Sequence, residues 1–163
     1  MVVGSLASSF HGEPRTTRDL NLVIDPTADP LTRFVESLPQ PEFYVDADAA
    51  AEALRRRSSF NVIDTDSGWK IDLLVRRDRP FSRQELDRRL PVRILEAETY
   101  VATAEDTVIA KLEWAREGES ERQLHDVAGI LALTGTTLDH VYLERWIAAL
   151  GLGEVWDRAR HLT

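Results

Sequence analysis

The chain has 163 residues and no cysteine, which excludes disulfide frameworks, thiolate catalysis and cysteine-based zinc sites. With 43% hydrophobic and 29% charged residues, it has the composition of a globular domain rather than a disordered segment. Its formal net charge of -8 argues against sequence-blind binding of nucleic acid over the whole surface.

Charge is distributed unevenly along the chain. Residues 1–54 carry 3 Lys and Arg against 9 Asp and Glu, residues 55–93 carry 11 against 6, and residues 94–163 carry 6 against 13. The basic middle segment begins with Arg55-Arg56-Arg57, a run that indicates either a solvated helix end or contacts with RNA phosphates. A chain that is acidic as a whole can therefore still offer one local basic approach to a nucleotide or an RNA.

The N-terminal segment MVVGSLASSF is apolar but lacks the basic residues that open a signal peptide. It ends before His11, far short of the roughly 20 residues of a membrane span. No later segment is long and apolar enough to cross a membrane. We therefore expect a cytoplasmic protein that makes no membrane contact.

Short apolar runs alternate with helical patterns in the first 102 residues. In chain order they predict a strand at 2–3 ending at Gly4-Ser5, a helix at 5–10, a strand at 20–24, a helix at 31–37, a strand at 42–45, a helix at 46–57, strands at 60–64 and 69–75, a helix at 83–90 and a strand at 92–95. The turn sequence T-D-S-G predicts that the strands at 60–64 and 69–75 form a hairpin.

From Thr103 onward the pattern becomes helical. Thr103 and Asp106 have the spacing of a helix-capping box, and an apolar stripe follows at three- and four-residue intervals. Further helices are predicted at 120–133, 139–150 and 154–161. The sequence thus predicts an α/β (α+β) core over residues 1–102 and a helical extension over residues 103–163.

Three features of the front half bear on chemistry. Gly4-Ser5 stands where a strand turns into a helix, and the N–H groups of a helix start favour an anion such as phosphate. Asp19 and Asn21 project from one face of a predicted strand, as oxygen ligands of Mg²⁺ beside phosphates would. Asp72 lies among apolar residues on a later strand, so it either faces solvent from a half-buried sheet or belongs to a site.

In this order the three features resemble the nucleotidyltransferase superfamily of the DNA polymerase β type, in which a G-S turn, a D-x-D pair and a third carboxylate follow one another. The segment G-S-L-A-S-S-F-H-G-E-P-R-T-T-R-D-L-N-L-V-I looks most like the minimal AbiEii/MenT-type members. The resemblance covers residues 2–75 and extends more loosely over residues 105–126. It implies a mixed sheet flanked by helices, with a C-terminal helical extension.

The resemblance also implies roles in nucleotide binding. Gly4 and Ser5 would hold the triphosphate of an incoming nucleoside triphosphate, and Arg15 would contribute to nucleotide binding. Lys111 would reach the phosphates as a point charge, and Asp126 would position Lys111 or the acceptor. On the residues alone, Lys111 is equally compatible with a helix-surface lysine that pairs with a nearby Glu.

For the reaction, the resemblance implies transfer of a nucleoside monophosphate to an acceptor hydroxyl with loss of pyrophosphate. Asp19, Asn21 and Asp72 would bind Mg²⁺, and Asp72 could instead assist deprotonation of the acceptor. The acceptor would be an RNA such as tRNA, or a protein. A role as the toxin of a toxin–antitoxin system, with an antitoxin as partner, is implied by the resemblance only.

Two departures from the family pattern modify these expectations. Asn21 stands where the family has a second Asp, so one carbonyl oxygen is kept and one negative charge is lost. Weaker metal binding and slower transfer follow, and the alternative is a catalytically impaired nucleotide-binding or protein-interaction module. The helix that members usually place before the first strand does not precede residue 2, so either the start is truncated or the fold dispenses with this helix. If the start is truncated, one sheet face would expose apolar surface to a partner or to a second copy in a homodimer.

Histidine and tryptophan residues supply weaker candidates. His11 lies in the Gly-containing turn region and is a candidate substrate contact, whereas His125 is expected to face solvent. Trp114, Trp146 and Trp156 lie near apolar helical positions, which predicts core packing rather than ligand contact.

Overall fold

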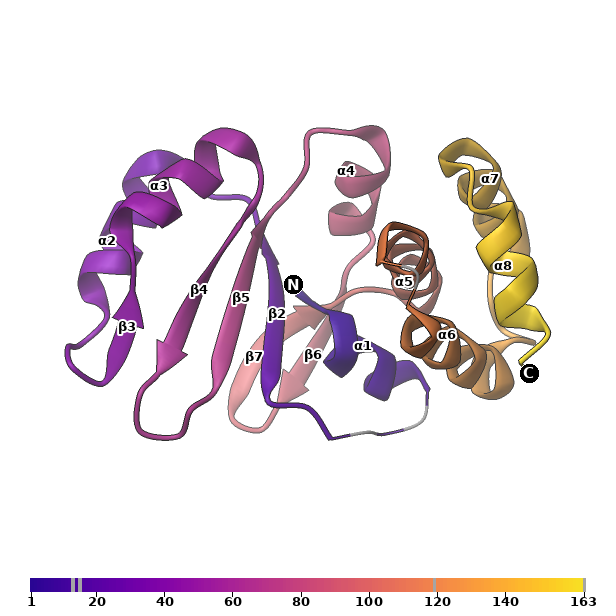
Figure 1. Ribbon diagram of the computed structural model, residues 1–163, viewed down its shortest axis with the longest axis horizontal. Helices are drawn as coiled ribbons and strands as arrows, with labels where there is room; N and C mark the ends of the chain where they lie inside the picture. Colours follow the sequence, from indigo (N-terminus) through magenta and orange to yellow (C-terminus); the bar gives the residue numbers. More distant parts are fainter. Residues whose placement is uncertain (13, 15, 119, 163) are drawn as a thin grey trace.

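The computed structural model describes residues 1–12, 14, 16–118 and 120–162, and at its centre these residues form a seven-stranded mixed sheet (Figure 1). The strands are β1 (Val2–Val3), β2 (Asp19–Ile24), β3 (Phe43–Val45), β4 (Ser59–Asp64), β5 (Lys70–Val75), β6 (Leu90–Ile94) and β7 (Ala97–Val101), in the spatial order β3-β4-β5-β2-β1-β7-β6. Strand β1 is parallel to β7 and β2 is parallel to β5, while the other pairs are antiparallel. The predicted mixed sheet flanked by helices is confirmed.

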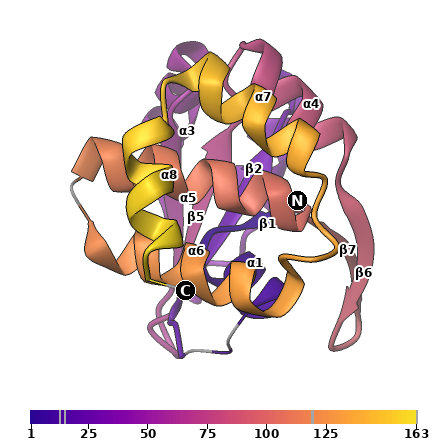
Figure 2. The ribbon, with the colours of Figure 1, turned by 90° about the vertical axis from the view of Figure 1, so that its right-hand side faces the viewer.

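The helices gather in two groups beside the sheet. They are α1 (Gly4–His11), α2 (Ala28–Ser37), α3 (Ala47–Arg56), α4 (Pro80–Asp87), α5 (Ala104–Gly118), α6 (Glu121–Thr134), α7 (His140–Leu150) and α8 (Gly153–Arg160). Figure 1 places α2 and α3 beside β3 and β4, with α5 to α8 at the opposite end. Figure 2 shows these four C-terminal helices in front of the sheet. In the described part of the chain, no helix has the length and hydrophobicity needed to cross a bilayer.

Most predicted elements are confirmed within a few residues, including the β4–β5 hairpin. Helix α4 begins earlier than the predicted 83–90, because Pro80 fits the first turn, where the missing N–H is not needed. The sequence reading gives no strand at 97–101, but the structure forms β7 there, paired with β6 across a turn in which Leu95 has φ 54°.

The two largest of four apolar clusters lie on either side of the described structure. One lies between the sheet and helices α2 and α3, where Leu31 and Ala53 pack with Phe60, Val62 and Leu73 of the strands. The other joins the C-terminal helices to one another and includes residues such as Leu112, Ile130 and Leu143, together with Phe81 of α4. The face of the sheet that packs against α2 and α3 is therefore apolar, and the polar side chains of these strands lie on the other face.

Strand alternation decides which side chains reach that opposite face. Leu22 and Leu73 point towards α2 and α3, so their neighbours in sequence point away. Val23 and Leu74 belong to a separate small cluster with Val3 and other residues. Residues two and four positions before Val23 and Leu74 share this second face, and they are the polar residues of the candidate site.

The first C-terminal helix begins directly after the sheet. Thr103 precedes α5, and its hydroxyl oxygen accepts a hydrogen bond from the Asp106 backbone N–H at 3.1 Å. The same hydroxyl donates to the Asp106 carboxylate at 2.8 Å. The predicted cap at Thr103 is confirmed, and it fixes where α5 starts relative to the end of β7.

Candidate functional site

Two parallel strands bring three of the sequence-predicted residues together. In the register of β2 and β5, Asn21 lies opposite Asp72, and Asp19 lies opposite Lys70. Because alternate residues of a strand share a face, these four side chains lie on the same face of the sheet. We call Asp19, Asn21, Lys70 and Asp72 the polar square. Asn61 of β4 continues the row on the other side of Asp72.

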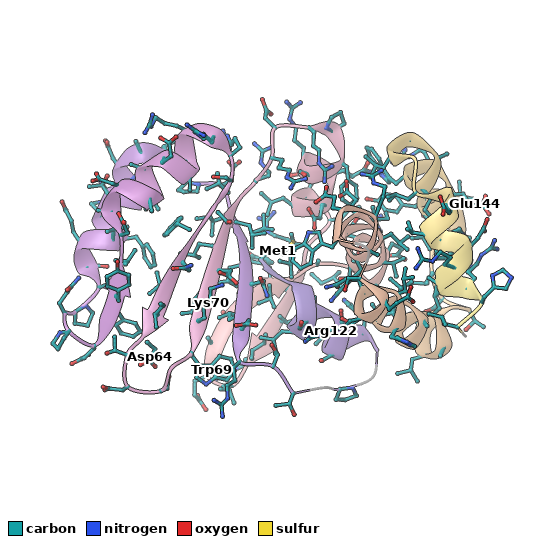
Figure 3. All side chains as sticks on the ribbon, in the orientation of Figure 1. Met1, Asp64, Trp69, Lys70, Arg122 and Glu144 are labelled. Carbon is teal, nitrogen blue, oxygen red and sulfur yellow. The ribbon has the colours of Figure 1, made fainter. Side chains whose placement is uncertain are left out.

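Lys70 is the member of the polar square that sequence reasoning missed. Its ammonium lies 2.9 Å from Oδ1 and 3.1 Å from Oδ2 of Asp72, so it bridges both carboxylate oxygens (Figure 3 labels Lys70). The hydrogen bond to Asp72, with a contribution from the charge of Asp19, raises the pKa of Lys70 above its ordinary value. The pattern K-x-D on one strand was the available signal, because residues two apart share a face.

Gly4 approaches the polar square from the start of α1. Its φ of 66° lies in the left-handed region, which favours glycine. A Cβ at this position would lie 2.9 Å from Nδ2 of Asn21, so only glycine lets the backbone come this close. The G-S turn and Asn21 of the D-x-N pair are therefore neighbours in space.

The start of α1 has the geometry of an anion site. Its N-cap residue, Val3, makes no side-chain hydrogen bond to the first turn, and the first backbone N–H groups of a helix favour an anion. Ser5 is part of this first turn. Arg15, the other predicted nucleotide-binding residue of this region, lies outside the described residues.

A cavity of about 280 Å³ adjoins the polar square. Its lining includes Gly4, Leu74 and Ser59, and the last two form the next row of the sheet face, directly beyond Asp72 and Asn61. The opposite wall comes from α5, through residues that include Lys111 and Trp114, and a further side from α4. The volume is near the lower limit of about 300 Å³ for small-molecule pockets.

Lys111 is buried, not on the helix surface. Its side chain is 2% exposed, and its ammonium lies 2.5 Å from Oδ2 of Asp126 on α6, whose side chain is 9% exposed. The surface alternative, in which Lys111 pairs with a nearby Glu, is thus wrong, because the helix face that carries Lys111 packs inward. Lys111 thus pairs with Asp126 and lines the cavity, while the roles that the family resemblance implied for these two residues stay predictions.

Arginine side chains from the basic middle segment line the other end of the cavity. Arg57 and Arg76 both contact the carboxylate of Asp25, at 2.6 and 2.8 Å. Arg79 forms a two-pronged pair with Glu113 of α5, with both distances 2.6 Å. One carboxylate shared by two guanidinium groups leaves positive charge at this end of the cavity.

Glu85 of α4 is a buried carboxyl group in the same wall. Burial, assisted by the negative charge of Asp106, raises the pKa of Glu85 to about 8, although Arg79 opposes the shift. Glu85 is therefore protonated at neutral pH and adds no negative charge to the cavity. Sequence reasoning did not identify it, because no local pattern marks an acidic residue as buried.

The remaining candidates have structural roles or remain exposed. His11 places Nε2 2.7 Å from the carbonyl oxygen of Ala102, a contact that ties α1 to the segment before α5. His125 is exposed, as expected. Trp146 and Trp156 pack against the core of the C-terminal helices, as predicted.

Trp114 and Arg57 both line the cavity. Trp114 is only half-buried and lines the cavity, so the prediction of plain core packing is wrong for this residue. Of the Arg55-Arg56-Arg57 run, the first two pair with Glu52 of the same helix, and the third reaches the cavity.

The oxygen ligands in the polar square suit one magnesium ion better than two. Among the described residues, no three His, Cys, Asp or Glu side chains come close enough together to hold a metal ion. Asp19 and Asp72 supply two carboxylates, and Asn21 supplies a neutral carbonyl oxygen. Mg²⁺ commonly takes one or two carboxylates and completes its shell with substrate phosphates and waters. This set fits one ion that arrives with a nucleotide, but not a pair of ions held by three carboxylates.

Comparison with known proteins identifies the fold. The chain is similar to the crystal structure of an antigenic nucleotidyltransferase-like protein from Paracoccidioides brasiliensis, with a TM-score of 0.57 over 91% of this chain and 77% of that chain. This chain has a nucleotidyltransferase-like fold. Sequence identity is 15%, so the similarity concerns architecture, and the AbiEii/MenT subgroup stays a prediction. No family model and no curated protein matches the sequence.

Proposed function

We propose that this chain is a nucleotidyltransferase that moves a nucleoside monophosphate from a nucleoside triphosphate to an acceptor hydroxyl. The observation that carries the proposal is the close approach of Gly4 to Asn21, which brings the start of α1 next to the strand face that carries Asp72 and Asp19. Separate parts of the sequence thus meet at one sheet face: a helix start, whose backbone N–H groups would bind phosphate, and two carboxylates, within a nucleotidyltransferase-like fold.

The triphosphate would bind at the start of α1. Backbone N–H groups beside Gly4 and Ser5 would face its oxygens, and Lys111 would contribute charge from the opposite wall of the cavity. Asp126 would hold the Lys111 ammonium in place. The half-buried Trp114 gives the same wall an aromatic surface on which a base could stack.

The transfer would be an in-line displacement at the α-phosphorus. The acceptor oxygen forms a bond to the α-phosphorus, the bond from that phosphorus to the bridging β-oxygen breaks, and pyrophosphate leaves with the electron pair. Asp72 would accept the proton of the acceptor hydroxyl. Mg²⁺ bound by Asp19, Asp72 and the Asn21 carbonyl would neutralise part of the triphosphate charge.

The acceptor would approach from the arginine-lined end of the cavity. Arg57, Arg76 and Arg79 lie there, and an RNA such as tRNA offers both the phosphates they would bind and a terminal hydroxyl. A protein hydroxyl is the other acceptor. We also propose that the protein acts as a toxin with an antitoxin partner and that it forms a homodimer. Neither proposal changes the chemistry of the transfer.

A transfer assay tests the proposal. The purified chain would be incubated with each nucleoside triphosphate labelled at the α-phosphate, Mg²⁺, and either total tRNA or candidate proteins, and label in the acceptor would be counted. We expect incorporation by the wild type and by Asn21→Asp, and none by Asp72→Asn. Asp29→Asn, which alters an exposed carboxylate on α2, is the matched control and should transfer as the wild type does.

Asn21 itself favours a second candidate function, nucleotide binding without transfer. It removes one negative charge from the metal ligands while keeping the contact with Gly4. Calorimetric titration with nucleoside triphosphates separates the two candidates. Binding by a wild type that transfers nothing, together with transfer by Asn21→Asp, would show an impaired enzyme; absence of transfer in both would leave only the binding module.

A further inference from the structure

Lys70 occupies a corner of the polar square that adjoins both carboxylates, and it is the corner that carries a positive charge. It lies two residues before Asp72 on β5 and directly opposite Asp19 on β2. Its ammonium contacts both oxygens of Asp72 and also feels the charge of Asp19. The positive group is therefore placed where the ligands of a metal ion converge.

We infer that Lys70 binds the triphosphate directly, and that its ammonium supplies one of the positive charges that metal ions would otherwise bring to this site. This inference rests on the proposed function, because it takes a nucleoside triphosphate as the ligand of the polar square. Its consequence is that nucleotide binding by this chain depends only weakly on divalent cations.

Charge balance supports the inference. A site with three carboxylates would carry three negative charges and would repel a triphosphate unless metal ions neutralised them. In this chain Asn21 removes one of these charges and Lys70 offsets another, so the polar square carries a net charge of -1. Both changes lower the negative charge of the polar square, so that it can bind an anion with fewer metal ions.

Exposure shows that Lys70 is available to a ligand. Its side chain is 44% exposed and that of Asp72 is 24% exposed, in contrast to the buried pair of Lys111 and Asp126. An exposed ion pair contributes little to stability, so moving the ammonium from Asp72 to a phosphate costs little. A lysine suits this exchange because its flexible chain carries three donors that rotate freely.

Titration of the wild type with ATP, and then with GTP, CTP and UTP, in Mg²⁺ or in EDTA tests the inference. For the wild type we expect EDTA to weaken binding by less than about tenfold. Lys70→Ala should bind at least about tenfold more weakly than the wild type in EDTA, and Lys70→Arg should keep most of the affinity. The double variant Asn21→Asp with Lys70→Ala carries three carboxylates and no ammonium, so it should bind nucleotides only with Mg²⁺.

A second measurement uses the metal alone. Mn²⁺ titration followed by electron paramagnetic resonance should show at least about tenfold tighter binding to the double variant than to the wild type. Arg93→Ala is the matched control, because Arg93 is an exposed, ion-paired cation on edge strand β6, away from the polar square. It should match the wild type in both measurements.

The outcomes separate this inference from the proposed function. Nucleotide binding by the wild type that needs Mg²⁺, or equal binding by Lys70→Ala and the wild type in EDTA, overturns the inference and leaves the proposed function in place. Absence of binding for every nucleotide in both conditions overturns both. Failure of the double variant to gain Mn²⁺ affinity overturns the charge-balance argument whatever the nucleotides do.

Discussion

The chain contains only two lysines, and each pairs with an aspartate at one wall of the same site, but in opposite surroundings. Lys70 and Asp72 lie on an open sheet face. Lys111 and Asp126 join helices α5 and α6 and are almost completely buried. The same two chemical groups are therefore paired once in contact with water and once in the protein interior.

The difference follows from the cost of removing charges from water. A buried ion pair stabilises a protein no more than a well-packed apolar contact does. Removing one partner is nevertheless costly, because the other charge then stays buried without its counter-charge. An exposed pair exchanges its partner for water at little cost. The buried pair is thus suited to fix the wall of the cavity, and the exposed pair to release its ammonium to a ligand.

Asp126→Ala should have the largest effect on stability. Removing the carboxylate takes from buried Lys111 the partner at 2.5 Å, and we expect the free energy of unfolding to fall by about 3–5 kcal/mol. Urea denaturation at pH 7 measures the loss. Joint replacement of Lys111 by Met and Asp126 by Leu should recover most of it, because the buried charge of Lys111 is then removed together with its partner. An Asp126→Ala loss below about 1 kcal/mol would place this pair in the same class as Lys70 and Asp72.

Glu85→Gln sharpens the comparison. Glu85 is a buried acidic group, and the salt bridges found among the described residues do not include it. Its pKa of about 8 in the folded state exceeds the unfolded value near 4.5. The free energy of unfolding is therefore not reduced by Glu85 below about pH 4.5. Between about pH 4.5 and 8 it falls, because of Glu85, by roughly 1.4 kcal/mol per pH unit. Glu85→Gln should be more stable than the wild type by about 3 kcal/mol at pH 7, with no gain near pH 4.

Denaturation curves at pH 4 to 8 check this prediction. The difference between the two proteins must grow with pH, since all other titrating groups are shared. Glu117→Gln, which alters a carboxyl group on α5 that is 50% exposed, is the control and should show no such growth. A constant difference between Glu85→Gln and the wild type would mean that Glu85 is ionised in the folded protein.

Gly4→Ala should have an intermediate effect at the open site. The left-handed φ of Gly4 costs an alanine roughly 1–2 kcal/mol, and the new Cβ would press on Asn21. Gly68→Ala is a matched control, because Gly68 has a similar φ of 72° but open space around its Cβ position. The excess loss of Gly4→Ala over Gly68→Ala in thermal denaturation measures the contact with Asn21. Equal losses would mean that the close approach is relieved without cost.

Much of the fold could be predicted because its signals are local. The T-D-S-G turn, the apolar alternation on either side of it and the cap at Thr103 each involve a few neighbouring residues. Strand β7 escaped prediction because its residues are mostly exposed, so the apolar alternation of a half-buried strand is weak. Only pairing with β6 on one side and β1 on the other makes this segment a strand.

The site was less predictable, because its members come together only through the register of distant strands. The order of Gly4, Asp19 and Asp72 indicated a nucleotidyltransferase-like fold, but nothing local showed that Lys70 would lie opposite Asp19. Burial of Glu85 and of Lys111 likewise depends on how α4 and α5 pack, which sequence periodicity does not resolve for single charged residues.

Lys70→Ala should have the smallest effect on stability, below about 1 kcal/mol, because its pair with Asp72 is exposed and screened by water. Even this difference should vanish in 1 M salt, where the Debye length is about 3 Å. Urea denaturation at low and high salt checks both statements. A loss comparable with that of Asp126→Ala would make Lys70 a structural residue and would contradict the idea that its ammonium can leave Asp72. A small, salt-sensitive loss means that any fall in nucleotide affinity of the same variant reports a lost ligand contact and not a damaged fold.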